Sequence, residues 1–164
     1  MSTYNSSPKS EEVPKGELGM LQLSTLNSQL STHFDAWGVA RIEPIEDEID
    51  RLKEWIGNGY HAEMQYMARN IELRANPCEL LPNAQSMIMV LMNYYPHEWQ
   101  PDNLPRIATY AYGNDYHHIV KSKLTQIAEE INKIVPHKYA VFCDSAPVME
   151  RAWAVRAGLG WIGR

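Results

Sequence analysis

The segment around Asp144 constrains the fold of this chain more than any other. An apolar run, Tyr139–Phe142, precedes Asp144 by one residue, and residues 145–158 have the apolar spacing of a helix. A strand that delivers a polar side chain and then passes into a helix is where α/β folds place their chemistry. We therefore expect an α/β fold, with Asp144 at the end of a strand.

The helix after Asp144 is expected to begin at once. Asp144 or Ser145 can cap its first turn, Pro147 suits that turn, and Glu150 lies where a capping box places a carboxylate. Gly158 suits the end of the helix. As a helix cap, Asp144 would need no catalytic role, and this is the structural alternative for the residue.

The rest of the expected fold is a central sheet flanked by helices. The unbroken apolar run Met87–Met92 predicts a central strand buried on both faces. Apolar residues at helical spacing predict three amphipathic helices, over residues 23–34, 45–56 and 119–134. Val39–Ile42 is expected to form a short strand, and alternation predicts another over residues 107–111. Gly38 suits the stop of the first helix.

Composition limits the domain organisation and the partners. A chain of 164 residues, 45% hydrophobic, has room for one domain with a core, expected over residues 20–164. Residues 1–19 are rich in Ser, Pro, Lys and Glu and are expected to form a flexible tail. The net charge of −5 gives no overall basic field, so any contact with RNA must be local.

The cysteine content excludes two kinds of site within this chain. Cys78 and Cys143 are its only two cysteines, which is too few for a disulfide framework or for the four thiolates of a cubane cluster. No apolar run reaches the ~20 residues of a membrane helix. A soluble, cytoplasmic protein without a membrane partner is the default expectation.

Metal and nucleophile sites are not expected either. The adjacent residues His117 and His118 point to different helix faces, and His61 lies far away in sequence, so we predict no metal site. Ser145 lacks the G-x-S-x-G turn of a hydrolase. Cys143 is most simply a small buried apolar residue.

Two further runs are rich in aromatic residues. Gly59–Asn70 is expected to form one or two helical turns, with Tyr60, Met64 and Met67 packed as a lid on the core. The run 106–118 carries three tyrosines before a long helix that Asp115 can cap. On residue chemistry alone, those tyrosines are half-buried rings with wet hydroxyl groups.

Taken together, four segments resemble the epoxyqueuosine reductases, cobalamin-dependent iron–sulfur enzymes that complete queuosine in the anticodon loop of tRNA. They are the Gly-Tyr-His run at 59–61, Leu-Leu-Pro at 80–82, Gly-x-Asp-Tyr-His at 113–117, and D-S-A-P-V-M-E-R-A with R-A-G-L-G-W-I-G at 144–163. The resemblance covers roughly residues 20–164. It implies a nitroreductase-like cobalamin-binding domain.

The resemblance also implies roles for single residues. Asp144 matches the aspartate that gives a proton when the epoxide is reduced, for which the pKa of an aspartic acid must rise by ~3 units from ~3.9. Burial beside an apolar corrin ring could supply that rise. The residues expected at the cofactor are Arg74, Ala108, Tyr110, Tyr112, Asp115, Tyr116 and Arg151.

The end of the chain departs from the family pattern. The glycine-rich run around Trp161, expected to pack about its indole, ends at Arg164, where the family has a lysine and then a ferredoxin-like cluster domain. We expect a chain cut before that domain, inactive without a cluster-bearing partner or another electron donor. The alternatives are a noncatalytic corrinoid-binding module, a corrinoid reductase with another substrate such as a dehalogenase, and, more distantly, a flavin nitroreductase.

Overall fold

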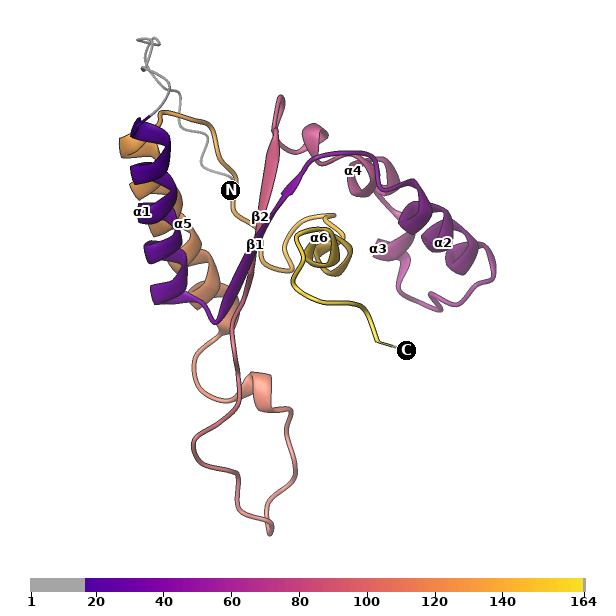
Figure 1. Ribbon diagram of the computed structural model, residues 1–164. Coiled ribbons are helices and arrows are strands. Elements are labelled where there is room, and N and C mark those ends of the chain that lie inside the picture. Colours follow the sequence, from indigo (N-terminus) through magenta and orange to yellow (C-terminus); the bar gives the residue numbers. More distant parts are fainter. Residues whose placement is uncertain (1–16, 164) are drawn as a thin grey trace. The chain divides into compact units, whose positions relative to one another are not determined.

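The computed structural model describes residues 17–163, with side chains from residue 24 onward (Figure 1). The helices are α1 (Glu17–His33), α2 (Glu46–Gly57), α3 (Gln65–Ala68), α4 (Ile71–Ala75), α5 (Tyr116–Ile134) and α6 (Glu150–Arg156). The strands are β1 (Ala36–Arg41) and β2 (Ser86–Leu91), and the 3-10 turns are η1 (Pro77–Glu79) and η2 (Thr109–Ala111). Residues 1–16 of the predicted flexible tail lie outside the described residues, whereas residues 17–19 belong to α1 and not to a tail.

The described chain divides into two compact units. The first contains residues 17–37, 90–137 and 141–143, and the second contains residues 38–89, 138–140 and 144–163. Strands β1 and β2 pair with each other, and each of them contributes residues to both units. This is an α/β architecture with a small sheet and many helices.

In the first unit, α1 packs beside α5 (Figure 1). Leu30 and Phe34, which are buried, meet the buried Ile127 of α5. These residues recur at helical spacing, so each helix presents one apolar stripe to the other. The ammonium group of Lys123 on α5 donates a hydrogen bond of 3.2 Å to the carbonyl oxygen of His33, which satisfies one of the free carbonyls at the end of α1.

In the second unit, the core gathers around one tryptophan. Trp153 of α6 is fully buried and packs in one cluster with Ala40 of β1, Ile45, and Ile49 of α2. Gly38 lies against the end of α6, where an added Cβ would be 2.2 Å from the carbonyl oxygen of Ala157. Glycine is therefore required at this crossing of strand and helix.

The three amphipathic helices predicted from sequence are confirmed, and the strand predicted at residues 39–42 is found as β1, which begins at Ala36 and ends at Arg41. The first helix ends at His33, so Gly38 does not stop it but lies inside β1. The prediction for Met87–Met92 is wrong in its burial: among the described residues β2 pairs only with β1, and Ile88 is 37% exposed. An apolar run of this kind predicts that a strand forms, but the burial of the strand depends on which other elements cover it.

Two other predicted strands are absent from the described structure. Residues 107–111 contain the 3-10 turn η2, and residues 139–142 form no strand. The alternation at 107–111 follows Pro105, and the loop turns tightly there instead of extending. The lid prediction is wrong for Tyr60 and Met64, which precede α3 and are 65% and 41% exposed, whereas Met67 of α3 is half-buried.

Residues 17–163 contain no helix that is both long and apolar enough to cross a membrane.

Candidate functional site

Asp144 lies in an unusual backbone conformation. Its φ angle is +51°, in the left-handed region that non-glycine residues seldom adopt and that aspartate tolerates better than most. Its side chain is exposed, and its backbone N–H donates a 2.9 Å hydrogen bond to Oε1 of Glu150. Non-glycine residues held in this region often lie at functional sites.

The expected helix cap is not formed. Helix α6 begins at Glu150, its N-cap is Met149, and no side chain caps it. Neither Asp144 nor Ser145 caps this helix, and Glu150 is its first residue, not the third residue of a capping box. The carboxylate of Glu150 instead reaches back six residues to the backbone of Asp144. The cap alternative for Asp144 is therefore wrong.

Helix α6 is firmly fixed at its other turns. Trp153 is fully buried, and the guanidinium carbon of Arg156 lies 5.6 Å from the centre of its indole ring. Arg156 also approaches Oε2 of Glu48 on α2 at 3.8 Å. Gly158, with φ +79°, ends the helix as predicted. Trp161 is 88% exposed, so the predicted packing of the glycine-rich run around its indole is wrong.

Two arginines expected at the cofactor lie in the same unit as Asp144. Arg74 belongs to α4, and its Nε atom is buried without a hydrogen-bond partner among the described residues. A buried guanidinium nitrogen without a partner is costly, so it marks a position where a ligand oxygen would be stabilising. Arg151 is on the exposed face of α6.

The tyrosines and Asp115 lie in the other unit. The ring of Tyr110 meets that of Tyr116 edge to face, with centroids 6.0 Å apart, and Tyr110 is 56% exposed. Tyr116 also stacks on the imidazole of His117, with centroids 4.0 Å apart. Ala108 is exposed just before η2, and its carbonyl oxygen accepts the N–H of Ala111. Two of the predicted residues, Tyr110 and Tyr116, thus form one aromatic pair.

Asp115 caps α5 as predicted. Its carboxylate accepts hydrogen bonds from the backbone N–H of His117 at 2.9 Å and from Nδ1 of the same residue at 2.7 Å. The side-chain bond from His117, followed by the backbone bond, holds the pKa of Asp115 below its ordinary value. His118 Nε2 lies 3.8 Å from the other carboxylate oxygen. Asp115 is therefore a stable anion at the start of this helix.

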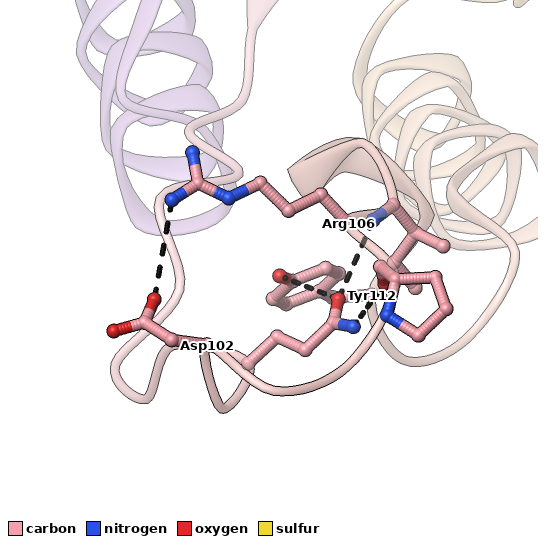
Figure 2. Close-up of polar contacts among 6 residues, drawn as sticks. Asp102, Arg106 and Tyr112 are labelled. Atoms are coloured by element: carbon pink, nitrogen blue, oxygen red, sulfur yellow. Dashed lines mark hydrogen bonds and ion pairs between the residues drawn. The ribbon is translucent and has the colours of Figure 1, made fainter.

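Tyr112 is held by a residue that the sequence did not single out. The Tyr112 hydroxyl, labelled in Figure 2, donates to Oε1 of Gln100 at 3.4 Å, and the same oxygen also accepts the N–H of Ile107. The side-chain amide of Gln100 donates to the carbonyl oxygen of Pro105. Gln100 thus organises this loop, and twelve residues of proline-interrupted sequence before Tyr112 gave no local signal for it.

Among the described residues, no group of three or more His, Cys, Asp or Glu side chains is placed to hold a metal ion. Cys143 is buried, as predicted.

A hollow of about 530 Å³ in the second unit lies against α2 and η1, and none of the predicted site residues line it.

Known proteins match this chain over most of its length. The family model for epoxyqueuosine reductase QueG, DUF1730, matches residues 74–145. An epoxyqueuosine reductase of Cellulophaga algicola is 42% identical over 132 residues, which cover 80% of this chain and 43% of that protein. One of Pseudomonas aeruginosa is 38% identical over 138 residues, covering 80% of this chain and 38% of the relative. This chain belongs to the epoxyqueuosine reductase family.

Solved structures of epoxyqueuosine reductases share the fold. A crystal structure of the enzyme with an epoxyqueuosine-modified stem loop of tRNA-Tyr aligns with a TM-score of 0.74, at 23% identity, covering 88% of this chain and 40% of that one. The enzyme from Streptococcus thermophilus aligns over the same shares, with a TM-score of 0.73. The chain therefore spans about two fifths of the length of the relatives that it matches.

Proposed function

We propose that residues 20–164 form the cobalamin-binding domain of an oxidoreductase that reduces epoxyqueuosine to queuosine in the anticodon loop of tRNA. The observation that carries the proposal is the 42% identity to an epoxyqueuosine reductase across 80% of this chain. A protein of the same fold has been crystallised with an epoxyqueuosine-modified stem loop, which supports tRNA as the substrate. Such an enzyme would work in the cytoplasm, where tRNA is used.

The residues present are chemically suited to a corrinoid. Its flat apolar ring fits aromatic surface, and its amide side chains need a few polar partners. Arg74 offers a buried Nε atom that lacks a protein partner among the described residues, and Tyr110 presents an exposed ring. The residues proposed to hold cobalamin are Arg74, Ala108, Tyr110, Tyr112, Asp115, Tyr116 and Arg151. Cobalamin would supply the electrons that open the epoxide.

Conversion of an epoxide to an alkene takes up two electrons and two protons and releases the oxygen as water. In this proposal Asp144 gives one of these protons to the departing oxygen, and solvent supplies the other. An oxygen expelled from carbon is a poor leaving group unless it is protonated, so an acid in reach lowers the barrier. Asp144 is exposed in this chain. The protonated form would be favoured only when cofactor and substrate cover the carboxyl and exclude water.

Electrons must come from outside residues 1–164. The two cysteines cannot ligate an iron–sulfur cluster, so we propose that a cluster-bearing domain or another electron donor serves the cobalamin. Residues 1–164 alone would then bind cofactor without turnover. The nitroreductase-like arrangement of the domain is part of the same proposal.

A spectral titration tests the cofactor assignment. Cobalamin added to the purified chain should change its visible absorption spectrum in a saturable way, and Arg74→Ala should weaken the binding. A matched control is Arg51→Ala, since Arg51 lies on the exposed face of α2 and pairs with Glu48. An unchanged spectrum at every cobalamin concentration would show that the chain does not bind cobalamin, and only its membership of the family would stand.

A turnover assay separates the enzyme from a noncatalytic corrinoid-binding module. With a cluster-bearing partner or a low-potential chemical reductant, the corrinoid-loaded chain should convert tRNA that carries epoxyqueuosine. A module that binds cofactor only would stay inert under the same conditions. A corrinoid reductase with another substrate would consume reductant with that substrate and leave the tRNA unchanged.

A further inference from the structure

We infer that Glu150 is a positioning residue for Asp144, holding its backbone so that the carboxyl faces the reacting epoxide. The inference rests on the proposed function of Asp144 as the acid. It is drawn from the 2.9 Å hydrogen bond between the Asp144 N–H and Oε1 of Glu150 and from the +51° φ angle of Asp144. Both residues belong to the second unit.

The left-handed conformation of Asp144 needs support. In this region the Cβ atom lies close to the following carbonyl oxygen, which disfavours it for residues other than glycine, although less for aspartate than for most. A hydrogen bond to a carboxylate is about twice as strong as one between neutral groups, which is enough to offset such a cost. When the acceptor is lost, Asp144 can relax to negative φ, and this rotation turns its side chain in a new direction relative to residues 139–143.

Glu150 is well placed to act as a fixed reference. It is the first residue of α6, whose next turn carries the fully buried Trp153. The same helix ends against Gly38, where there is no room for a side chain. Because these contacts fix α6 in the core of the second unit, the hydrogen bond to Glu150 holds the Asp144 backbone in a defined position relative to that core.

Amide hydrogen exchange of Asp144, followed by NMR on the full chain, tests the contact directly. Glu150→Ala should speed exchange of the Asp144 N–H by about tenfold or more, because a bond to a charged acceptor is lost. Glu150→Gln keeps an acceptor oxygen and should restore much of the protection. Glu54→Ala, on the exposed face of α2, is the matched control and should leave this amide unchanged.

Turnover of the natural enzyme that carries this sequence, with its electron donor, tests the positioning role. Glu150→Ala should lower kcat at least tenfold with little change in KM for tRNA or in corrinoid affinity, and Glu150→Gln should recover much of kcat. A change that only loosens the fold would lower corrinoid affinity as well and would not be rescued by glutamine.

The outcomes are distinguishable. Unchanged exchange of the Asp144 amide in Glu150→Ala overturns the inference and leaves the proposed function untouched. Faster exchange with unchanged kcat, while Asp144→Asn abolishes turnover, overturns the positioning role alone. Full turnover by Asp144→Asn removes Asp144 as the acid, and the positioning role with it.

Discussion

The contact between Gly38 and α6 gives a sharp prediction for stability. In Gly38→Ala, the new Cβ atom would lie 2.2 Å from the carbonyl oxygen of Ala157 and 3.0 Å from its carbonyl carbon. Both atoms are backbone, so the clash cannot be relieved by a side-chain rotation. Overpacking of this kind costs ~1–3 kcal/mol, and the reduced freedom of the unfolded chain returns at most ~1 kcal/mol.

The assay is urea unfolding with thermal melting as a second reading. For a chain of this size, a loss of ~1 kcal/mol lowers the melting temperature by ~2–4 °C, so Gly38→Ala should melt several degrees below the parent chain. Gly57→Ala is the matched control, since no described atom lies within 4 Å of its new Cβ, and it should be neutral or slightly stabilising. A Gly38→Ala chain as stable as Gly57→Ala would refute the close approach of β1 and α6.

Three further predictions concern the core, the start of α5 and the end of α1. Trp153→Ala should cost ~3–5 kcal/mol of unfolding free energy in urea, because the fully buried indole leaves a cavity; a loss below ~1 kcal/mol would contradict its place in the core. Asp115→Ala should lower the melting temperature above about pH 4, where the Asp115 carboxylate, whose pKa is lowered by His117, is charged. The difference in melting temperature between the parent and the variant should fade as the pH drops through that lowered pKa. A difference that persists at low pH would contradict this prediction. Lys123→Met should lose ~1–2 kcal/mol, because the carbonyl oxygen of His33 loses a charged donor; an equally stable variant would show that water replaces the lysine.

Periodic patterns and local caps were readable from the sequence. The apolar residues of α2 and α5 recur every three or four positions, so both helices were predictable. The start of α5 was predictable as well, because Asp115 accepts the backbone N–H of His117, two residues later. The family, too, was recognisable from short motifs such as Asp-Ser-Ala-Pro at 144–147. All of these signals lie within a few neighbouring residues.

What the sequence could not give depends on contacts between distant residues. The run Met87–Met92 has the composition of a buried strand, but its burial is set by which elements cover β2. Helix α6 starts late because Glu150 bonds to Asp144 instead of closing a capping box. The link from Gln100 to Tyr112 spans a loop that Pro101 and Pro105 interrupt, and no spacing rule predicts such a bond.

The central claim is that Asp144 protonates the oxygen of an epoxide opened by a corrinoid. The most direct measurement is the conversion of epoxyqueuosine to queuosine in tRNA, followed by mass spectrometry of the nucleosides, with the parent enzyme and Asp144→Asn compared at equal cobalamin occupancy. We expect the parent to convert the tRNA. Asp144→Asn should bind cobalamin and tRNA normally but form queuosine at least a hundredfold more slowly, as expected for loss of a general acid. Equal rates for the two proteins would contradict the central claim.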